Sequence, residues 1–353
     1  MASRNIRYHV NFNGGFTGIN NPGGQTYYVG ASGYAAAGDG IAPSNSNTGT
    51  SPQAPLSTIQ AALDKCVSGR GDVVAVLPGS YTVSAAITMT KDDVRLVSAQ
   101  PVGPREYGPV VIVDATAATS LLTINANNCT VDGIVFDDNV AAATADTGAI
   151  MINTASTGKL FSGTILRNCY IDMDGADTDR DGICVGLTAD ATDAAPKTTV
   201  EGCVVYNCEQ DAIVVNVGSD GSVVRDCYIY DDGTRLCRYG VEVLAIECAV
   251  EGCDIMLSDT ATPGACVHNG IAAARLLVTG SNLHAWGADT TCILVVNTAT
   301  QRTANNWLTA TAIGNTVDYL TDNTTNSADT NISALFEAAP TASEFDTPTV
   351  AGS

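Results

Sequence analysis

Three aspartates give this sequence its clearest candidate for metal chemistry. Asp177, Asp179 and Asp181 stand at alternate positions before Gly182, the spacing with which calcium loops place carboxylates around one hard cation. The match is partial, because the twelfth position is Thr188, where such loops carry a bidentate glutamate. The segment therefore predicts either a Ca²⁺ site at the three aspartates or a plain acidic loop, and no other cofactor is expected.

Two pairs of adjacent aspartates are candidates for acid–base chemistry. Asp137-Asp138 and Asp231-Asp232 follow strand-like segments, and two carboxyl groups at a strand end can supply the acid and the base of a glycosidase. Aspartates are also common turn residues. A lyase acting on an acidic polysaccharide needs a base beside cations that neutralise the sugar carboxylate. No such grouping is evident around the four lysines, so the sequence names no catalytic residue; the lysines are Lys65, Lys91, Lys159 and Lys197.

The aspartates lie within a sequence repeat that determines the fold around them. Four segments share the frame apolar-x-x-Cys-x-apolar, and weaker copies flank them; the anchors are Cys129, Cys169, Cys203, Cys227, Cys253, Ser281 and Asn315. They recur at intervals between 24 residues (Cys203 to Cys227) and 40 residues (Cys129 to Cys169). Short strand-like runs fill the intervals and leave no room for crossover helices. The repeat predicts an all-β fold, a single-stranded right-handed parallel β-helix whose coils stack.

Period-2 alternation assigns the two faces of each predicted strand. The cysteines point inward as a column of buried, reduced thiols, because free Cys behaves as a small apolar residue. Aromatic and apolar residues recur on one outer face: Tyr170, Tyr206, Tyr228, Tyr230, Met256 and His284. This stripe has three interpretations, namely a subunit interface, a sugar-stacking surface or cover by a long loop. The interface is favoured because the aromatic residues stack in register along the axis.

The ends of the chain differ from the repeat. Residues 1–26 are expected to form an arm and linker, residues 27–320 the β-helix, and residues 321–353 a C-terminal cover or tail. Residues 57–65 combine a capping-box pattern with apolar residues at helical spacing, which predicts a short helix that plugs the open end of the solenoid.

The amino-acid composition argues against several classes of binding partner. The chain has 16 Lys and Arg against 37 Asp and Glu, a formal net charge of -21, so nucleic acid and anionic membranes are not expected as partners. Neither a secretory signal nor a membrane-spanning apolar run is evident, which indicates a soluble protein made in a cytoplasm. Zinc is not expected, because C-x-x-C motifs are absent and there are three His.

Two N-terminal segments look like the opening of pectate-lyase-superfamily right-handed β-helices, many of them encoded by phages: residues 51–63, SPQAPLSTIQAAL, and residues 71–81, GDVVAVLPGSY. The resemblance covers residues 27–319. It is specific for fold and not for activity, since the superfamily includes lyases, hydrolases, tailspikes and non-catalytic virion proteins. The Gly-His-Gly and Arg-x-Lys runs associated with β-helix polygalacturonases are missing.

These features favour a non-enzymatic phage virion protein, made in the host cytoplasm, that decorates the capsid or forms a spike or fibre. By analogy with tailspikes it is expected to self-associate, as a trimer, to contact other virion proteins such as the capsid, and to have surface polysaccharide as a further partner. The alternative is a polysaccharide depolymerase, a lyase or glycoside hydrolase, with carboxylates from the insertion loops and Ca²⁺ near Asp177.

Overall fold

The computed structural model describes residues 23–310 with gaps at 35–39, 101, 115–119, 139–146, 154–159, 174–179, 188–193, 234–236, 259–263, 271–274, 286–289, 296–299 and 305. It also describes four short strands outside this range. β1 (His9–Val10) and β2 (Phe16–Thr17) pair antiparallel, whereas β30 (Ser327–Ala328) and β31 (Ser333–Phe336) extend the main sheets.

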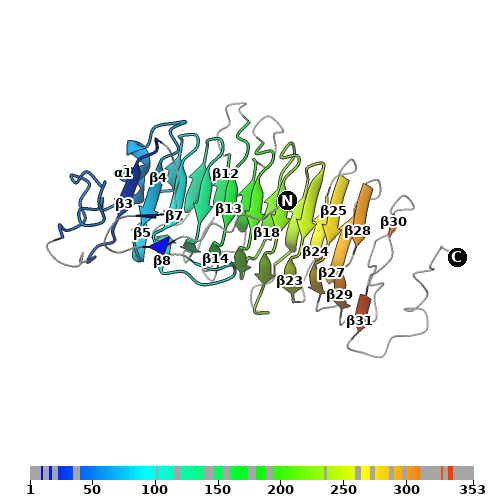
Figure 1. Cartoon of the computed structure of the whole chain (residues 1–353). Helices are drawn as coiled ribbons and strands as arrows, with labels where there is room; N and C mark the ends of the chain where they lie inside the picture. The colour runs from blue at the N-terminus through cyan, green and yellow to red at the C-terminus, as the bar shows by residue number, and fades with distance from the viewer. Residues whose placement is uncertain are drawn as a thin grey trace.

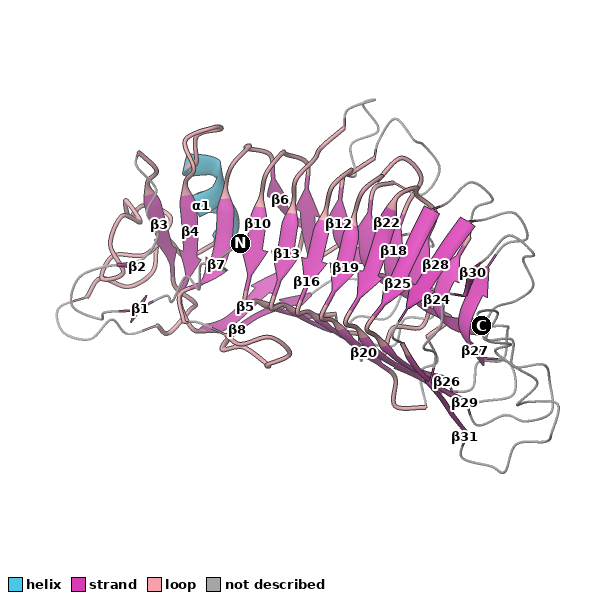
Figure 2. Cartoon of the chain, turned by 45° about the vertical axis from the view of Figure 1, so that its right-hand side comes forward, coloured by secondary structure: helices cyan, strands magenta, loops and turns pink. Residues whose placement is uncertain are grey.

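Three parallel sheets run side by side along one elongated tube (Figures 1 and 2). The first sheet contains, in order, β3 (Thr26–Val29), β4 (Val73–Val76), β7 (Arg95–Ser98), β10 (Thr130–Asp132), β13 (Ile165–Arg167), β16 (Thr199–Glu201), β19 (Val223–Arg225), β22 (Cys248–Glu251), β25 (Arg275–Thr279), β28 (Thr300–Ala304) and β30. The second contains β5 (Gly79–Val83), β8 (Val110–Asp114), β11 (Val135–Asp137), β14 (Tyr170–Asp172), β17 (Val204–Tyr206), β20 (Tyr228–Tyr230), β23 (Asp254–Leu257), β26 (Asn282–Ala285), β29 (Trp307–Ala310) and β31. The third contains β6 (Ile87–Met89), β9 (Leu122–Ile124), β12 (Thr147–Ile152), β15 (Arg180–Val185), β18 (Asp211–Val215), β21 (Tyr239–Val243), β24 (Gly264–Asn269) and β27 (Thr290–Val295).

From β4 to β27 each coil gives one strand to each sheet, and the next coil stacks on it with all strands parallel. The predicted parallel β-helix is therefore confirmed. One continuous apolar core fills the tube from Val29 to Ile293.

The corner between the first and second sheets explains the repeated cysteine frame. One residue per coil has a left-handed backbone, with φ between 52° and 71°; these residues are Gly133, Asn168, Gly202, Asp226, Gly252 and Gly280. Gly, Asn and Asp tolerate this conformation best. The next residue points into the core and must be small or apolar, and this inner column is Ile134, Cys169, Cys203, Cys227, Cys253 and Ser281.

Two of the predicted anchors were misplaced. Cys129 lies at a different corner, before the first-sheet strand, in a buried column with Thr164, Thr198, Ser222 and Cys248. The register also puts Asn306, not Asn315, after Ser281, and Asn306 Oδ1 accepts a hydrogen bond from Ser281 N at 2.9 Å. Asn315 itself lies outside the described residues. Cys129 was misleading because Asn128 before it also has a left-handed backbone, so both corners carry the same dipeptide.

The capping helix is confirmed with a later start. Helix α1 (Ile59–Lys65) is capped by Thr58, whose Oγ1 accepts a hydrogen bond from Ala61 N, so it begins two residues after the predicted position 57. Ile59, Ala62 and Leu63 are buried against the first coils, at the N-terminal end of the tube (Figure 1). Within the described ranges, no helix has the length and apolar character that crossing a membrane requires.

All twelve cysteines are buried and have free thiols. A thiol reagent added to the native protein without reductant is therefore expected to label none of them within minutes, and to label all twelve after denaturation. Fewer than twelve reactive thiols in denaturant would reveal disulfides and contradict this description of the core. The measurement is a colorimetric thiol titration with and without guanidinium chloride.

Candidate functional site

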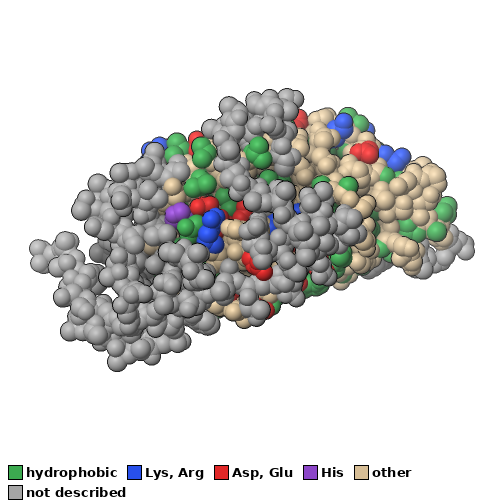
Figure 3. Space-filling view, turned by 180° about the vertical axis from the view of Figure 1, so that it is seen from behind, with side chains coloured by type: hydrophobic (Ala, Val, Ile, Leu, Met, Phe, Trp, Pro, Cys, Tyr) green, Lys and Arg blue, Asp and Glu red, His purple; other side chains and the backbone are tan. Residues whose placement is uncertain are grey.

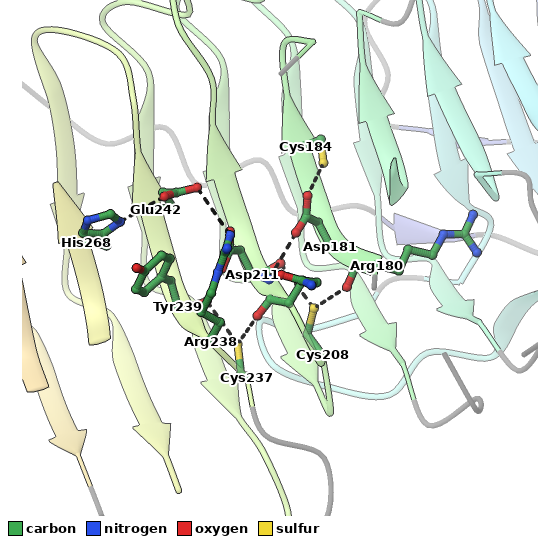
Figure 4. Close-up of polar contacts among 11 residues, drawn as sticks. Arg180, Asp181, Cys184, Cys208, Asp211, Cys237, Arg238, Tyr239, Glu242 and His268 are labelled. Carbon is green, nitrogen blue, oxygen red and sulfur yellow. Dashed lines mark hydrogen bonds and ion pairs between the residues drawn. The ribbon is translucent and has the colours of Figure 1, made fainter. Parts of the chain in front are cut away.

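A cluster of ionisable side chains lies on the outer face of the third sheet. Asp181, Asp211 and Glu242 come from three successive strands, β15, β18 and β21, while Arg238 directly precedes β21 and His268 belongs to β24 (Figure 4). Glu242 faces outward because its two neighbours in the strand are core valines. The register then places His268 beside it. Seen from behind, this face shows acidic, basic and histidine side chains gathered together (Figure 3).

Arg238 is the cation at the centre of the cluster. Its Nε donates to Asp211 Oδ1 at 2.9 Å, and its Nη2 donates to the other oxygen of the same carboxylate. The same Nη2 lies 3.9 Å from Glu242 Oε2. The Asp211 side chain is 1% exposed and that of Arg238 41%, so the guanidinium covers Asp211 on its solvent side.

Asp181 and Asp211 both have raised pKa values. Burial raises the pKa of Asp181 from an ordinary 3.8 to about 6, against hydrogen bonds from the Cys184 thiol and the Asp211 backbone. Burial, together with the nearby charges of Glu242 and Asp181, raises the pKa of Asp211 to about 8 even though Arg238 lowers it. Each carboxyl group therefore holds its proton to a higher pH than an exposed aspartate does.

The pKa of Glu242 is shifted in the opposite direction. Burial alone would raise its pKa, but the hydrogen bond with His268, a hydrogen bond from Asp211 and the charge of Arg238 hold the pKa of Glu242 below its ordinary value. His268 Nδ1 lies 2.9 Å from Glu242 Oε1. The ring of His268 is held in turn by Tyr239, at 4.1 Å between ring centroids. Two raised pKa values thus stand beside one lowered pKa, which separates carboxyl groups that can act as acids from one that can act as a base.

These pKa values predict how stability depends on pH. A carboxyl group whose pKa is higher in the folded state binds more protons than in the unfolded state, so stability falls as pH rises between the two pKa values. For Asp211 that window runs from about 4 to about 8, and for Asp181 from about 4 to about 6. Urea denaturation is expected to give a lower free energy of unfolding at pH 8 than at pH 5, and Asp211→Asn should flatten this decline. A steeper decline in the variant would contradict the assignment.

The predicted tyrosine stripe lies where the alternation placed it, on the outer face of the second sheet. The register aligns Tyr206, Tyr230, Met256 and His284 in one outer row. Tyr170 and Tyr228 lie in the adjacent row, and the Tyr170 and Tyr230 hydroxyl oxygens are 2.9 Å apart.

A strap formed by residues 102–109 crosses this face. Tyr107 packs edge-on against Tyr170, with ring centroids 5.0 Å apart, and the Arg105 guanidinium lies 5.6 Å from the centre of the Tyr228 ring. Arg105 also donates to the backbone oxygen of Cys227 and lies 3.7 Å from an Asp254 oxygen. Cover by a loop, one of the three interpretations, is thus observed over Tyr170 and Tyr228. Interface and glycan binding stay predictions for the rest of the stripe.

The structure describes only one of the three predicted calcium ligands, Asp181. Asp177 and Asp179 lie outside the described residues, whereas Asp181 belongs to the acidic cluster. The part of the chain that the structure describes contains no group of three or more His, Cys, Asp or Glu arranged to hold a metal ion. Ca²⁺ binding therefore remains a prediction.

One aspartate of each adjacent pair makes a structural contact. Asp138 forms a buried ion pair with Arg180, at 2.6 Å between Oδ2 and Nη1. Asp231 accepts hydrogen bonds from the backbone N–H groups of Gly233 and Ser258, as a turn residue does.

The comparisons with known proteins concern the fold. No protein-family model matches the sequence, and no curated protein matches it. A rhamnogalacturonan lyase structure has a TM-score of 0.51 and 11% identity, over 86% of this chain and 87% of that chain. The chain is a right-handed parallel β-helix. Other similar structures are the pectate lyase Pel9A (TM-score 0.49, 14% identity, 86% of this chain and 79% of that chain) and a pectin methylesterase from Aspergillus niger (0.47, 13%, 83% and 93%). At these identities the likeness is one of fold alone.

Proposed function

We propose that this β-helix is a polysaccharide-degrading enzyme, a glycoside hydrolase, whose active site is the cluster of Asp181, Asp211, Arg238, Glu242 and His268. The observation that carries the proposal is the division of pKa values among three carboxyl groups on neighbouring strands: two are raised and one is lowered. Glycosidases need a carboxylic acid that still holds its proton beside a carboxylate that has lost it.

The role that we propose for each carboxyl group follows from its solvent exposure and its charge. Asp181 is partly exposed, so it is the acid that reaches the glycosidic oxygen. Glu242 supplies the carboxylate, as a base toward water or as the nucleophile. Asp211 is almost fully buried, so its role is to hold Arg238.

A hydrolase fits the site better than a lyase. Among the described residues, the basic groups in contact with the three carboxylates are Arg238 and His268, and both are engaged by those carboxylates. They are therefore poorly placed to neutralise a sugar carboxylate. The net charge of -21 also repels anionic chains, so the proposed substrate is a neutral polysaccharide. The shared fold with a rhamnogalacturonan lyase supports a scaffold suited to long sugar chains.

Product analysis tests this proposal. The purified protein is incubated with neutral bacterial surface polysaccharides, and with polygalacturonate and alginate as acidic controls. We expect new reducing ends from a neutral polysaccharide, without the ultraviolet absorbance of an unsaturated sugar. Unsaturated products would show a lyase instead, and a panel without any new reducing ends would count against an enzyme.

The tyrosine stripe favours a second candidate, the non-enzymatic virion component. Tyr206, Tyr230, Met256 and His284 remain partly exposed in one row along the axis, beyond the strap contacts described above. A partly apolar row of this kind suits self-association as a trimer in a phage spike, fibre or capsid decoration. Native mass spectrometry tests it: a trimer that dissociates in Tyr206→Ser/Tyr230→Ser would support it, and a monomer in the unsubstituted protein would exclude it.

A further inference from the structure

One cysteine differs from the other eleven. Eleven cysteine side chains belong to the apolar core of the tube, and Cys184 does not. The register puts Cys184 in the outer row of the third sheet, the row that continues through Val214 to Glu242 and His268. Cys184 is nevertheless fully buried. Its thiol is therefore enclosed on the face that carries the acidic cluster.

The Cys184 thiol makes a specific polar contact. Its Sγ lies 3.2 Å from Asp181 Oδ2, and the backbone N–H of Asp211 donates to Asp181 Oδ1 at 3.1 Å. Both oxygens of Asp181 thus have a donor, which fixes the plane of the carboxyl group (Figure 4). Because Cys184 is fully buried and its nearest polar partner is a carboxyl oxygen, the sulfur keeps its proton and acts as a hydrogen-bond donor.

The neighbouring strand leaves space for this sulfur. Gly148 of β12 lies beside Cys184, and a Cβ atom at position 148 would stand 3.0 Å from Sγ and 2.9 Å from the Ile150 carbonyl oxygen. A side chain there would therefore push against the thiol. The contact between Cys184 and Asp181 is thus supported from the adjacent coil as well as by its own hydrogen bond.

We propose that Cys184 is a positioning residue whose S–H group holds the Asp181 carboxyl group in place for proton transfer to the substrate. The catalytic consequence rests on the proposed glycoside hydrolase function. The hydrogen bond itself does not, and it is testable without a substrate.

The test compares Cys184→Ala, which removes the donor, with Cys184→Ser, which keeps a donor of similar size. Carbon-13 NMR of the aspartate carboxyl groups follows the titration of Asp181. Because the thiol stabilises the carboxylate, Cys184→Ala is expected to raise the pKa of Asp181 by roughly one unit, whereas Cys184→Ser should leave it within a few tenths of a unit or lower it. Cys253→Ala, a matched deletion in the core column, should leave the pKa of Asp181 unchanged.

Infrared spectroscopy of the S–H stretch gives a second readout that needs no Cys184 variant to fold. The other hydrogen-bonded thiols, such as Cys208 and Cys237, donate to backbone oxygens, whereas Cys184 donates to a carboxylate. The unsubstituted protein is expected to show a separate band component from this thiol, and Asp181→Leu should shift that component toward the frequency of a free thiol. An unchanged band, or an unchanged pKa of Asp181 in Cys184→Ala, would overturn the inference.

The two proposals fail separately. If the pKa of Asp181 responds as expected but no polysaccharide is hydrolysed, the proposed function fails and the positioning contact stands. If hydrolysis occurs and its pH profile is the same in the Cys184→Ala and unsubstituted proteins, the positioning role fails and the function stands.

Discussion

Replacing Asp181 by Asn is expected to lower the turnover of a polysaccharide substrate by a factor of about 10² to 10⁴, the usual contribution of a positioned general acid. Asn has nearly the same shape and can still accept a hydrogen bond from the Asp211 backbone, but it cannot donate a proton to a glycosidic oxygen. The affinity for the polysaccharide should therefore change little. Initial rates of reducing-end release, with binding measured by calorimetry, separate the two effects.

A matched control is available on the second sheet. Asp254 is also partly exposed on an outer strand face and lies near an arginine, Arg105, but it is outside the acidic cluster. Asp254→Asn is expected to leave turnover within about twofold of the unsubstituted protein. If Asp181→Asn kept the activity of this control, Asp181 would not be the acid.

The second large effect concerns stability. Arg180 directly precedes Asp181, and its side chain is 1% exposed in the ion pair with Asp138, which is 3% exposed. Arg180→Met removes one partner and leaves an uncompensated buried carboxylate, which is expected to lower the free energy of unfolding by about 3 to 5 kcal/mol. The measurement is urea denaturation at pH 7, followed by circular dichroism.

An exposed pair in the same solenoid serves as the control. Arg225 pairs with Glu201 on the outer face of the first sheet, with side chains 45% and 35% exposed. Arg225→Met is expected to lower the free energy of unfolding by at most about 1 kcal/mol, because solvent screens the ion pair. Equal losses in the two variants would show that the Arg180–Asp138 contact adds nothing beyond an ordinary surface pair.

The stacked coils could be predicted from the sequence because the backbone conformation at each corner restricts which residues can occupy it. A left-handed backbone selects Gly, Asn or Asp, and the next position selects a small inward residue, so Asn168-Cys169 and Gly202-Cys203 repeat visibly. The prediction was wrong at Cys129 because a second corner obeys the same rule. Only the strand register, which depends on pairing between coils, separates the two columns.

The candidate site was harder to predict. Asp181 was identified, but as a metal ligand within a local motif. Asp211, Arg238, Glu242 and His268 share no motif, because they are brought together by stacking of successive coils. Aligning the coils on the core valines would have placed Glu242 beside His268, since each directly follows one: Val241 and Val267. The bend that turns Arg238 toward Asp211 carries no comparable periodic signal.

A carboxyl titration of the unsubstituted protein tests most directly whether the pKa values of Asp181 and Asp211 are raised while that of Glu242 is lowered. Carbon-13 NMR with selectively labelled aspartate and glutamate follows each group without any substrate. We expect pKa values of about 6 for Asp181 and about 8 for Asp211, with that of Glu242 below its ordinary 4.5. Three carboxyl groups that all ionise near pH 4 would contradict this expectation.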